Sequence, residues 1–244
     1  MLAAAAPITP KRYPVSNQVS AYRVIAGSGG SNTETIAIMY GNMTNPDTID
    51  TYQSSAEEYY ENNADRSVIE ELVSRFLTAV QNATDKRSAR IVDVGCGPGW
   101  ESSTFAAHGH EALGIDLTPA FLQAARREIP TASFARMDMR RLSLATDSFD
   151  GLWSCASFLH ISRDDALATL AEFHRVLRPG GVGLVSVKRG DGEMRGDTYS
   201  GDRRRFTLYQ PDELRARAVD AGFTVTSVDT GVDDDDWIQL FLRA

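Results

Sequence analysis

The chain has 244 residues, of which 42% are hydrophobic and 24% are charged, so it can bury the core of one large α/β domain. Its formal net charge of −8 argues against a general nucleic-acid binder, whose binding surface would be basic. No apolar run reaches about 18 residues, so we expect no membrane-spanning helix. Met1 is not followed by a secretory signal pattern, and the two cysteines, Cys96 and Cys155, lie in apolar runs. We therefore expect a reduced, cytoplasmic protein without a disulfide scaffold.

Residues 1–48 differ in composition from the rest of the chain. They are rich in Ser, Asn, Thr, Gly and Ala, and the run Gly-Ser-Gly-Gly-Ser-Asn at 27–32 is typical of a flexible segment. This pattern predicts a flexible N-terminal extension, with a specific lid or an oligomerisation arm as the alternative. We expect the folded domain to occupy residues 49–244.

Residues 49–83 are expected to form a helical cap at the start of the domain. Over 50–62, Tyr52, Ala56 and Tyr59 recur at helical spacing. A Ser-x-x-Glu capping box, Ser67 with Glu70, then predicts the start of a second helix. Its expected apolar face consists of Val68, Ile69, Leu72, Val73, Phe76, Leu77 and Val80.

From residue 89 onward, short apolar strands alternate with helical patterns. Strands are expected over 90–94, 112–115, 133–135, 149–155, 182–187, 223–228 and 237–242. Helices are expected over 100–108 and 119–127, from a cap formed by Ser162 and Asp165, and from Pro211. The helix after Ser162 carries Leu167, Leu170, Phe173 and Leu177 on its expected apolar face. This alternation indicates a mainly parallel sheet with helices on both faces. The last two strands have no helix between them and should pair as an antiparallel hairpin.

The carboxyl ends of the first three strands carry the candidate binding residues, because ligands bind there in such a sheet. The first strand ends in Asp93-Val94-Gly95-Cys96-Gly97-Pro98-Gly99, where alternate glycines let a ligand approach the backbone closely. For this loop alone, a tight strand-to-helix turn is the alternative. Asp116 ends the second strand and can accept hydrogen bonds from two ribose hydroxyls. Asp138, after the third strand, can accept from an exocyclic amine such as that of adenine. Together these residues predict a nucleoside site.

Several segments then follow one another in a familiar order. They are Ile-Val-Asp-Val-Gly-Cys-Gly-Pro-Gly at 91–99, Gly-Ile-Asp-Leu at 114–117, Met-Asp-Met at 137–139, Phe-Asp-Gly-Leu-Trp at 149–153 and Arg-Val-Leu-Arg-Pro-Gly-Gly at 175–181. With them, the chain from about residue 50 to its end resembles the class I S-adenosylmethionine-dependent methyltransferases. The resemblance implies an α/β fold with a doubly wound, mainly parallel seven-stranded sheet, in the order 3-2-1-4-5-7-6 with the last strand antiparallel.

The resemblance also implies S-adenosylmethionine as the cofactor and a role for each matching residue. The glycine loop would lie against the methionine part and the ribose, with Asp93 ordering the loop. Asp116 would hold the ribose diol, Asp138 the adenine amine, and the carbonyl of Ser154 or Cys155 the methionine amine. The full set assigned to the cofactor is Tyr59, Asp93, Gly95, Cys96, Gly97, Gly99, Asp116, Leu117, Asp138, Met139, Ser154 and Cys155.

A catalytic base is needed only for some acceptors, because methyl transfer depends chiefly on placing an in-line nucleophile. A hydroxyl or a protonated amine would require one. His160, on the loop after the fourth strand, is the candidate base. The alternative is a histidine that orients this loop.

The acceptor side is expected in the loop 188–209, before the last helix. Arg204 and Arg205 can receive a carboxylate or phosphate of the acceptor, and Tyr52 and Tyr209 are further candidate contacts. Acidic residues are interspersed in the same loop, so a self-paired surface loop is the alternative.

The sequence therefore predicts a methyltransferase that acts on an O or N atom of a small-molecule acceptor, as a monomer or homodimer. A tRNA, rRNA or protein acceptor is the second choice, because an arginine patch can bind a larger substrate locally. Two alternatives come from other classes: an NAD(P)-dependent oxidoreductase and a non-catalytic cofactor-binding module. The oxidoreductase fingerprint Gly-x-Gly-x-x-Gly is not matched, since the third glycine comes one residue early. We expect no metal site, and the acidic run 233–236 is interpreted as a solvated hairpin tip.

Overall fold

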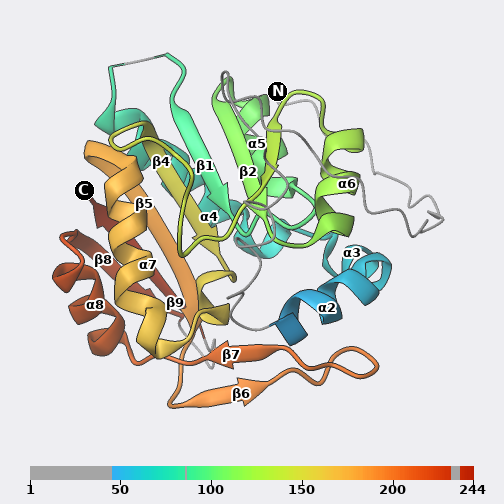
Figure 1. Ribbon diagram of the computed structural model, residues 1–244. Helices are drawn as coiled ribbons and strands as arrows, with labels where there is room; N and C mark the ends of the chain where they lie inside the picture. Colours follow the sequence, from blue (N-terminus) through green and yellow to red (C-terminus); the bar gives the residue numbers. More distant parts are fainter. Residues whose placement is uncertain (1–45, 86, 232–236) are drawn as a thin grey trace, which may run out of the picture.

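A seven-stranded sheet in the order β3-β2-β1-β4-β5-β9-β8 lies at the centre of the computed structural model, which describes residues 46–85, 87–231 and 237–244 (Figure 1). Its strands are β1 (Arg90–Val94), β2 (Glu111–Asp116), β3 (Ser133–Arg136), β4 (Phe149–Cys155), β5 (Leu177–Lys188), β8 (Thr224–Thr230) and β9 (Trp237–Arg243). The first five strands pair in parallel, and β9 is antiparallel to both of its neighbours. This arrangement confirms the predicted fold class and strand order.

Helices cover both faces of the sheet and bury it on each side. On one face, α4 (Glu70–Ala83) and α5 (Trp100–Ala107) pack Phe76 and Phe105 against Trp153 of β4. On the other face, α7 (Arg163–Val176) and α8 (Pro211–Asp220) cover the core that contains Leu170 and Leu214. The helix α6 (Pro119–Glu128) packs beside β2 and β3. Strand β4 is buried on both faces and is mainly apolar, and its buried polar residues Asp150 and Ser154 have hydrogen-bond partners.

Some local expectations about the helices are wrong. The capping box at Ser67 does not form: residues 67–69 make the short 3-10 turn η1 (Ser67–Ile69), and the Ser67 backbone N–H donates to Asp65 Oδ1 at 2.9 Å. Consequently α4 begins at Glu70, and Val68 is 84% exposed instead of lying on the apolar face. Leu167 of α7 is likewise exposed, at 43%. The cap at Ser162 does form, since its side chain accepts from the Asp165 N–H at 3.2 Å.

The predicted helix over 50–62 is two helices, α2 (Pro46–Ser54) and α3 (Ala56–Asn63), and α2 starts within the segment assigned to the extension. They lie across the carboxyl ends of the strands (Figure 1). The rest of the predicted extension and the acidic run 233–236 lie outside the described residues.

The loop 188–209 contains a second, two-stranded sheet that the sequence did not predict. It consists of β6 (Glu193–Arg195) and β7 (Arg205–Thr207), which pair in antiparallel fashion. Strand β5 also starts earlier than expected, at Leu177, and an irregularity in its pairing with β4 accommodates the Pro-Gly-Gly turn. In the part of the chain that the structure describes, every helix is too short or too polar to cross a bilayer.

Candidate functional site

The glycine loop between β1 and α5 has a backbone that only glycine adopts easily. Gly95, Gly97 and Gly99 have φ angles of +73°, +51° and +88°. A Cβ on Gly95 would lie 2.3 Å from the Ser157 Cβ, so the loop after β4 packs directly on this backbone. Beside Gly97 the nearest neighbour is a Tyr59 ring carbon, 4.0 Å from the ideal Cβ position. The loop therefore leaves space beside the Gly97 backbone, and we call this backbone the cradle. Tyr59 of the cap is the side chain that lies nearest to it.

Two carboxylates lie beside this loop, as the sequence predicts. Asp116 accepts hydrogen bonds from the Gly97 N–H at 3.0 Å and the Thr118 N–H at 2.7 Å, one on each oxygen. Each oxygen keeps a second lone pair, so Asp116 can still accept from a diol. Asp93 is buried and accepts from the Ser102 hydroxyl at 2.7 Å. Burial raises the pKa of both carboxyl groups, and the neighbouring Glu101 raises that of Asp93 further.

An ion pair that the sequence did not indicate completes this side of the site. Arg66, between α3 and α4, donates to Glu101 Oε1 at 2.7 Å, and its guanidinium lies 5.1 Å from the Trp100 ring centroid. Glu101 is only 7% exposed although its side chain is a carboxyl group. The sequence held one local signal for Glu101: it is an acid in the first turn of the helix that follows the glycine loop. The pair ties the end of the cap to the glycine loop.

The predicted adenine contact, Asp138, is engaged by a neighbour. Its carboxylate accepts from the Arg140 guanidinium, with an Nη2–Oδ2 distance of 2.6 Å, and from the Arg140 backbone N–H at 3.0 Å. Arg140 Nη1 also reaches Asp165 at 3.4 Å. A ligand amine would therefore share this carboxylate with Arg140. Met139 is half-buried beside it, as Leu117 is at the end of β2.

At the end of β4, the predicted contacts Ser154 and Cys155 belong to the sheet. The Ser154 hydroxyl donates to Ser157 Oγ at 2.8 Å, because the Ser157 proton is used by the Val94 carbonyl at 2.6 Å. Burial raises the pKa of the Cys155 thiol to about 12, so it stays protonated at neutral pH. The next residue, Ala156, has a φ of +53°, where the chain turns away from the strand. The roles of both carbonyls toward a ligand stay predictions.

An aromatic cluster from the cap covers the loop. The Tyr59 ring lies 4.9 Å from Phe121 and stacks at 6.0 Å on Trp100, and Tyr52 meets Tyr59 edge to face at 5.5 Å. On the same helix as Tyr52, Gln53 Oε1 accepts the Ala120 N–H at 3.0 Å, one of the free N–H groups at the start of α6. The cap is thereby fastened over the carboxyl ends of β1 and β2.

His160 bonds to the cap through Tyr52 and to β7 through a carbonyl. Its Nδ1 lies 2.8 Å from the Arg205 carbonyl oxygen, which can only accept, so Nδ1 carries the proton. The Tyr52 hydroxyl then donates to Nε2, at 3.0 Å. Burial lowers the pKa of His160 to about 4 and raises that of Tyr52 to about 12, so both are neutral at pH 7. In this arrangement His160 has no free lone pair with which to act as a base.

The predicted acceptor contact Arg204 is paired within its own loop. Its guanidinium donates to both oxygens of Asp202, at 2.6 Å for Nη2–Oδ2, and the two side chains are 7% and 2% exposed. Three rings surround it, those of Tyr52, Tyr199 and Phe206, with centroids at 5.2, 4.4 and 5.2 Å. Arg204 therefore fits the alternative in which charged residues of the loop 188–209 pair with one another.

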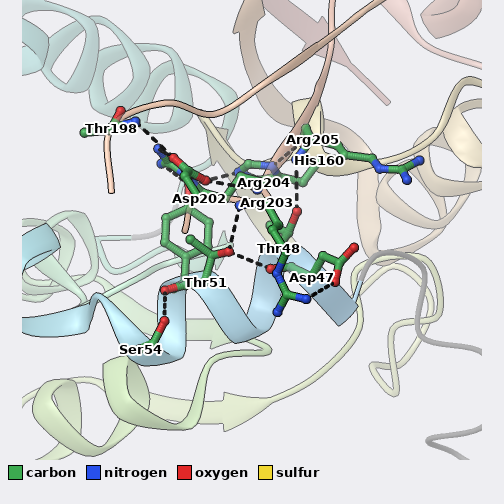
Figure 2. Close-up of polar contacts among 11 residues, drawn as sticks. Asp47, Thr48, Thr51, Ser54, His160, Thr198, Asp202, Arg203, Arg204 and Arg205 are labelled. Carbon is green, nitrogen blue, oxygen red and sulfur yellow. Dashed lines mark hydrogen bonds and ion pairs between the residues drawn. The ribbon is translucent and has the colours of Figure 1, made fainter. Parts of the chain in front are cut away.

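The other two predicted acceptor residues have opposite environments. The Arg205 side chain is exposed and points away from the polar contacts around Asp202 (Figure 2), with no ion pair or hydrogen bond to any described residue. Tyr209 is fully buried in the main core, 5.1 Å below the Arg163 guanidinium, and its hydroxyl finds no partner among the described residues. Burial raises its pKa to about 12. Of Arg204, Arg205 and Tyr209, only Arg205 is exposed, whereas Tyr52 is half-buried.

Comparison with known proteins shows what the chain is similar to. Residues 91–181 match the family model described as "Methyltransferase domain". Malonyl-[acyl-carrier protein] O-methyltransferase of Enterobacter lignolyticus is 37% identical over 98 residues, which are 40% of this chain and 38% of that protein. An O-methyltransferase of Pyrenophora dematioidea is 30% identical over 146 residues, 55% of this chain and 54% of that protein. The chain thus spans only about two fifths and about half of these curated relatives.

A solved structure extends the likeness to nearly the whole chain. It is the 1,6-didemethyltoxoflavin-N1-methyltransferase of Burkholderia thailandensis, with bound 1,6-didemethyltoxoflavin and S-adenosylhomocysteine. The TM-score is 0.65 over 90% of this chain and 92% of that one, at 19% identity, which shows a shared fold. Residues 91–181 are therefore similar to a methyltransferase domain, and the chain shares the fold of this solved N1-methyltransferase.

Proposed function

We propose that this chain uses S-adenosylmethionine to methylate an O or N atom of a small-molecule acceptor. The observation that carries the proposal is the cradle at Gly97 with Asp116 bonded to its N–H, in a domain of this fold. The residues fit the cofactor, because a glycine backbone admits a ligand and a half-buried carboxylate with free lone pairs suits a ribose diol. Asp93, Asp138, Met139 and the aromatic cap complete the proposed cofactor contacts.

When bound, S-adenosylmethionine would supply a sulfonium methyl group, which an in-line nucleophile takes as the C–S bond breaks and S-adenosylhomocysteine is left. The chain orients the two reactants, which can lower the activation free energy by roughly 7–11 kcal/mol when they are well placed. The rings of Tyr52, Tyr59 and Phe121 exclude water from the mouth of the sheet. Because both ring nitrogens of His160 are engaged, we assign it a positioning role: it holds Tyr52, and with it the cap, against the rest of the site.

The contact between the cap and the hairpin supports the acceptor class, and the named relatives support the kind of atom that is methylated. The cap and the β6–β7 hairpin meet above the strand ends, which favours a small ligand over a macromolecule. The relatives named O-methyltransferases support an oxygen atom, and the N1-methyltransferase neighbour supports a nitrogen atom. Of the two predicted arginines, Arg205 is the exposed one and makes no ion pair with a described residue, so it is the one we assign to a carboxylate or phosphate on the acceptor.

Isothermal titration calorimetry tests the cofactor directly. We expect S-adenosylmethionine and S-adenosylhomocysteine to bind and NAD not to bind. Asp116→Ala should weaken S-adenosylhomocysteine binding roughly 10- to 150-fold, since it removes hydrogen bonds to a charged group. Asp220→Ala, an exposed acid at the end of α8, is the control and should leave the affinity unchanged. Binding of NAD alone, or of none of the three, would overturn the proposal. Transfer of labelled methyl into a small-metabolite fraction, and not into RNA or protein, tests the acceptor class.

A further inference from the structure

The helix α2 contains a short sequence repeat whose two threonines are buried. Residues 47–51 read Asp-Thr-Ile-Asp-Thr, so Thr48 and Thr51 stand three apart on one helical face. Both threonines are buried, at 5% and 4% exposure. A helix of nine residues has little stability of its own, so its position depends on what these side chains contact.

The two threonines bind the free edge of the hairpin segment that leads into β7. The Arg203 N–H donates to Thr51 Oγ1 and the Arg205 N–H donates to Thr48 Oγ1, both at 3.2 Å (Figure 2). Residues two apart in an extended chain present their N–H groups along the same edge, which matches the three-residue spacing on the helix. The Thr51 hydroxyl proton is used by the Asp47 carbonyl at 2.8 Å, so its oxygen is oriented as an acceptor. We call these two hydrogen bonds the threonine latch.

The acidic residues of the repeat add a weaker contact. Arg203 reaches Asp47 at 3.0 Å and Asp50 at 3.8 Å. The three side chains are 38–68% exposed, and exposed ion pairs contribute little because solvent and salt screen them. The buried threonine bonds therefore dominate the docking of α2 on the hairpin.

The latch determines where the aromatic cap lies. On the helix that it holds, Tyr52 points to His160, and the following helix brings Tyr59 over Gly97. The other side of α2 is held at the start of α6 through Gln53. The helix thus spans the mouth of the site, and the acceptor-side hairpin is one of its supports, beside α6 and His160.

We propose that the β6–β7 hairpin sets the position of the cofactor cap through the threonine latch, which makes Thr48 and Thr51 positioning residues for a nucleoside that neither of them touches. The inference rests on the proposed function. It implies that an acceptor which orders the hairpin tightens the cofactor site, and by linkage the cofactor tightens the acceptor site to the same degree.

The test compares two double variants by calorimetry with S-adenosylhomocysteine. Thr48→Val/Thr51→Val keeps the shape of both side chains and removes both acceptors, and we expect the dissociation constant to rise roughly tenfold. Thr48→Ser/Thr51→Ser keeps the hydroxyl groups and should stay within about twofold of the parent. Thr78→Val removes an exposed hydroxyl that bonds only within α4 and should change nothing. Hydrogen exchange should accelerate over 46–63 in the valine pair and not in β1.

The outcomes distinguish failure of the threonine latch from failure of the proposed function. A dissociation constant for the valine pair within twofold of the parent overturns the latch, as does failure of the serine pair to restore affinity. If the valine pair does not fold, Thr51→Val alone carries the test, with a smaller rise expected and an unchanged affinity counting against the proposal. If the parent protein binds no S-adenosylhomocysteine, the proposed function fails instead, and exchange over 46–63 still reports whether the latch holds α2.

Discussion

Replacing Asp202 with Asn removes the charge that neutralises a buried guanidinium. The Asp202 carboxylate accepts from the Thr198 N–H at 3.1 Å, the Arg204 N–H at 3.0 Å and the Arg204 guanidinium at 2.6 Å. It also requires glycine at position 196, where a Cβ would lie 2.4 Å from its Oδ2. The substitution keeps the volume of the side chain, so the expected effect comes from charge and hydrogen bonding.

The magnitude follows from burial. Loss of one partner of a buried ion pair costs about 3–5 kcal/mol, and here the two side chains are 7% and 2% exposed. Burial acts to raise the pKa of Asp202, but hydrogen bonds from Arg204 outweigh it and lower the pKa from 3.8 to about 2. That difference corresponds to about 2.4 kcal/mol, which is of the same order. The stabilisation is complete above about pH 4 and is lost as the pH falls toward 2.

Urea unfolding at pH 7, followed by circular dichroism, measures the effect. We expect Asp202→Asn to lower the free energy of unfolding by about 2–5 kcal/mol. The double variant Asp202→Asn/Arg204→Met should recover part of this loss, because a neutral pair leaves no buried charge unpaired. A loss below about 1 kcal/mol, or a double variant as unstable as the two single variants added together, would refute the reasoning.

His160→Ala should lower kcat by less than about tenfold while weakening S-adenosylhomocysteine binding, whereas a drop of about 100-fold or more would assign it as a general base. The affinity of the parent should be constant above about pH 6.5 and fall toward pH 4, because protonated Nε2 cannot accept from the cap; a pH-independent affinity would contradict this. Gly95→Ala should lower the free energy of unfolding in urea by about 2–5 kcal/mol, because of the positive φ and the contact with Ser157. Gly109→Ala, which has a positive φ but open space around it, should lower it by about 1–2 kcal/mol. Equal losses for the two glycines would show that the close contact is not felt.

The strands of the central sheet were predictable because their signal is local. The boundaries of β1 and β4 coincide with the predicted 90–94 and 149–155, since strands buried on both faces read as short apolar runs between turn residues. The glycine loop and Asp116 were found for the same reason: they follow those strands directly, and the fold brings the strand ends together.

The cap and the hairpin were predicted less well because contacts between distant segments shape them. Ser67 satisfied the pattern of a capping box, yet Asp65 competes for its N–H and the first turn becomes a 3-10 helix. Each strand of the hairpin has only three residues, too few for an alternating pattern to be recognised, and the segment between the strands folds around the carboxylate of Asp202. Local patterns carry no information about such partners.

By itself, the sequence determined the order of the strands along the chain, the glycine cradle and the acids beside it, because each depends on residues next to one another. The tertiary structure alone decided which side chains are available to a ligand. Tyr52 meets His160 across 108 residues, Arg66 meets Glu101 across 35, and the latch joins Thr48 and Thr51 to the hairpin across more than 150. The fold likewise pairs Arg204 with Asp202 in its own loop and buries Tyr209 in the core, and the contact with Tyr52 assigns His160 to the cap. Their strength comes from burial, since a hydrogen bond or ion pair shielded from water stabilises one arrangement only once the whole chain has folded around it.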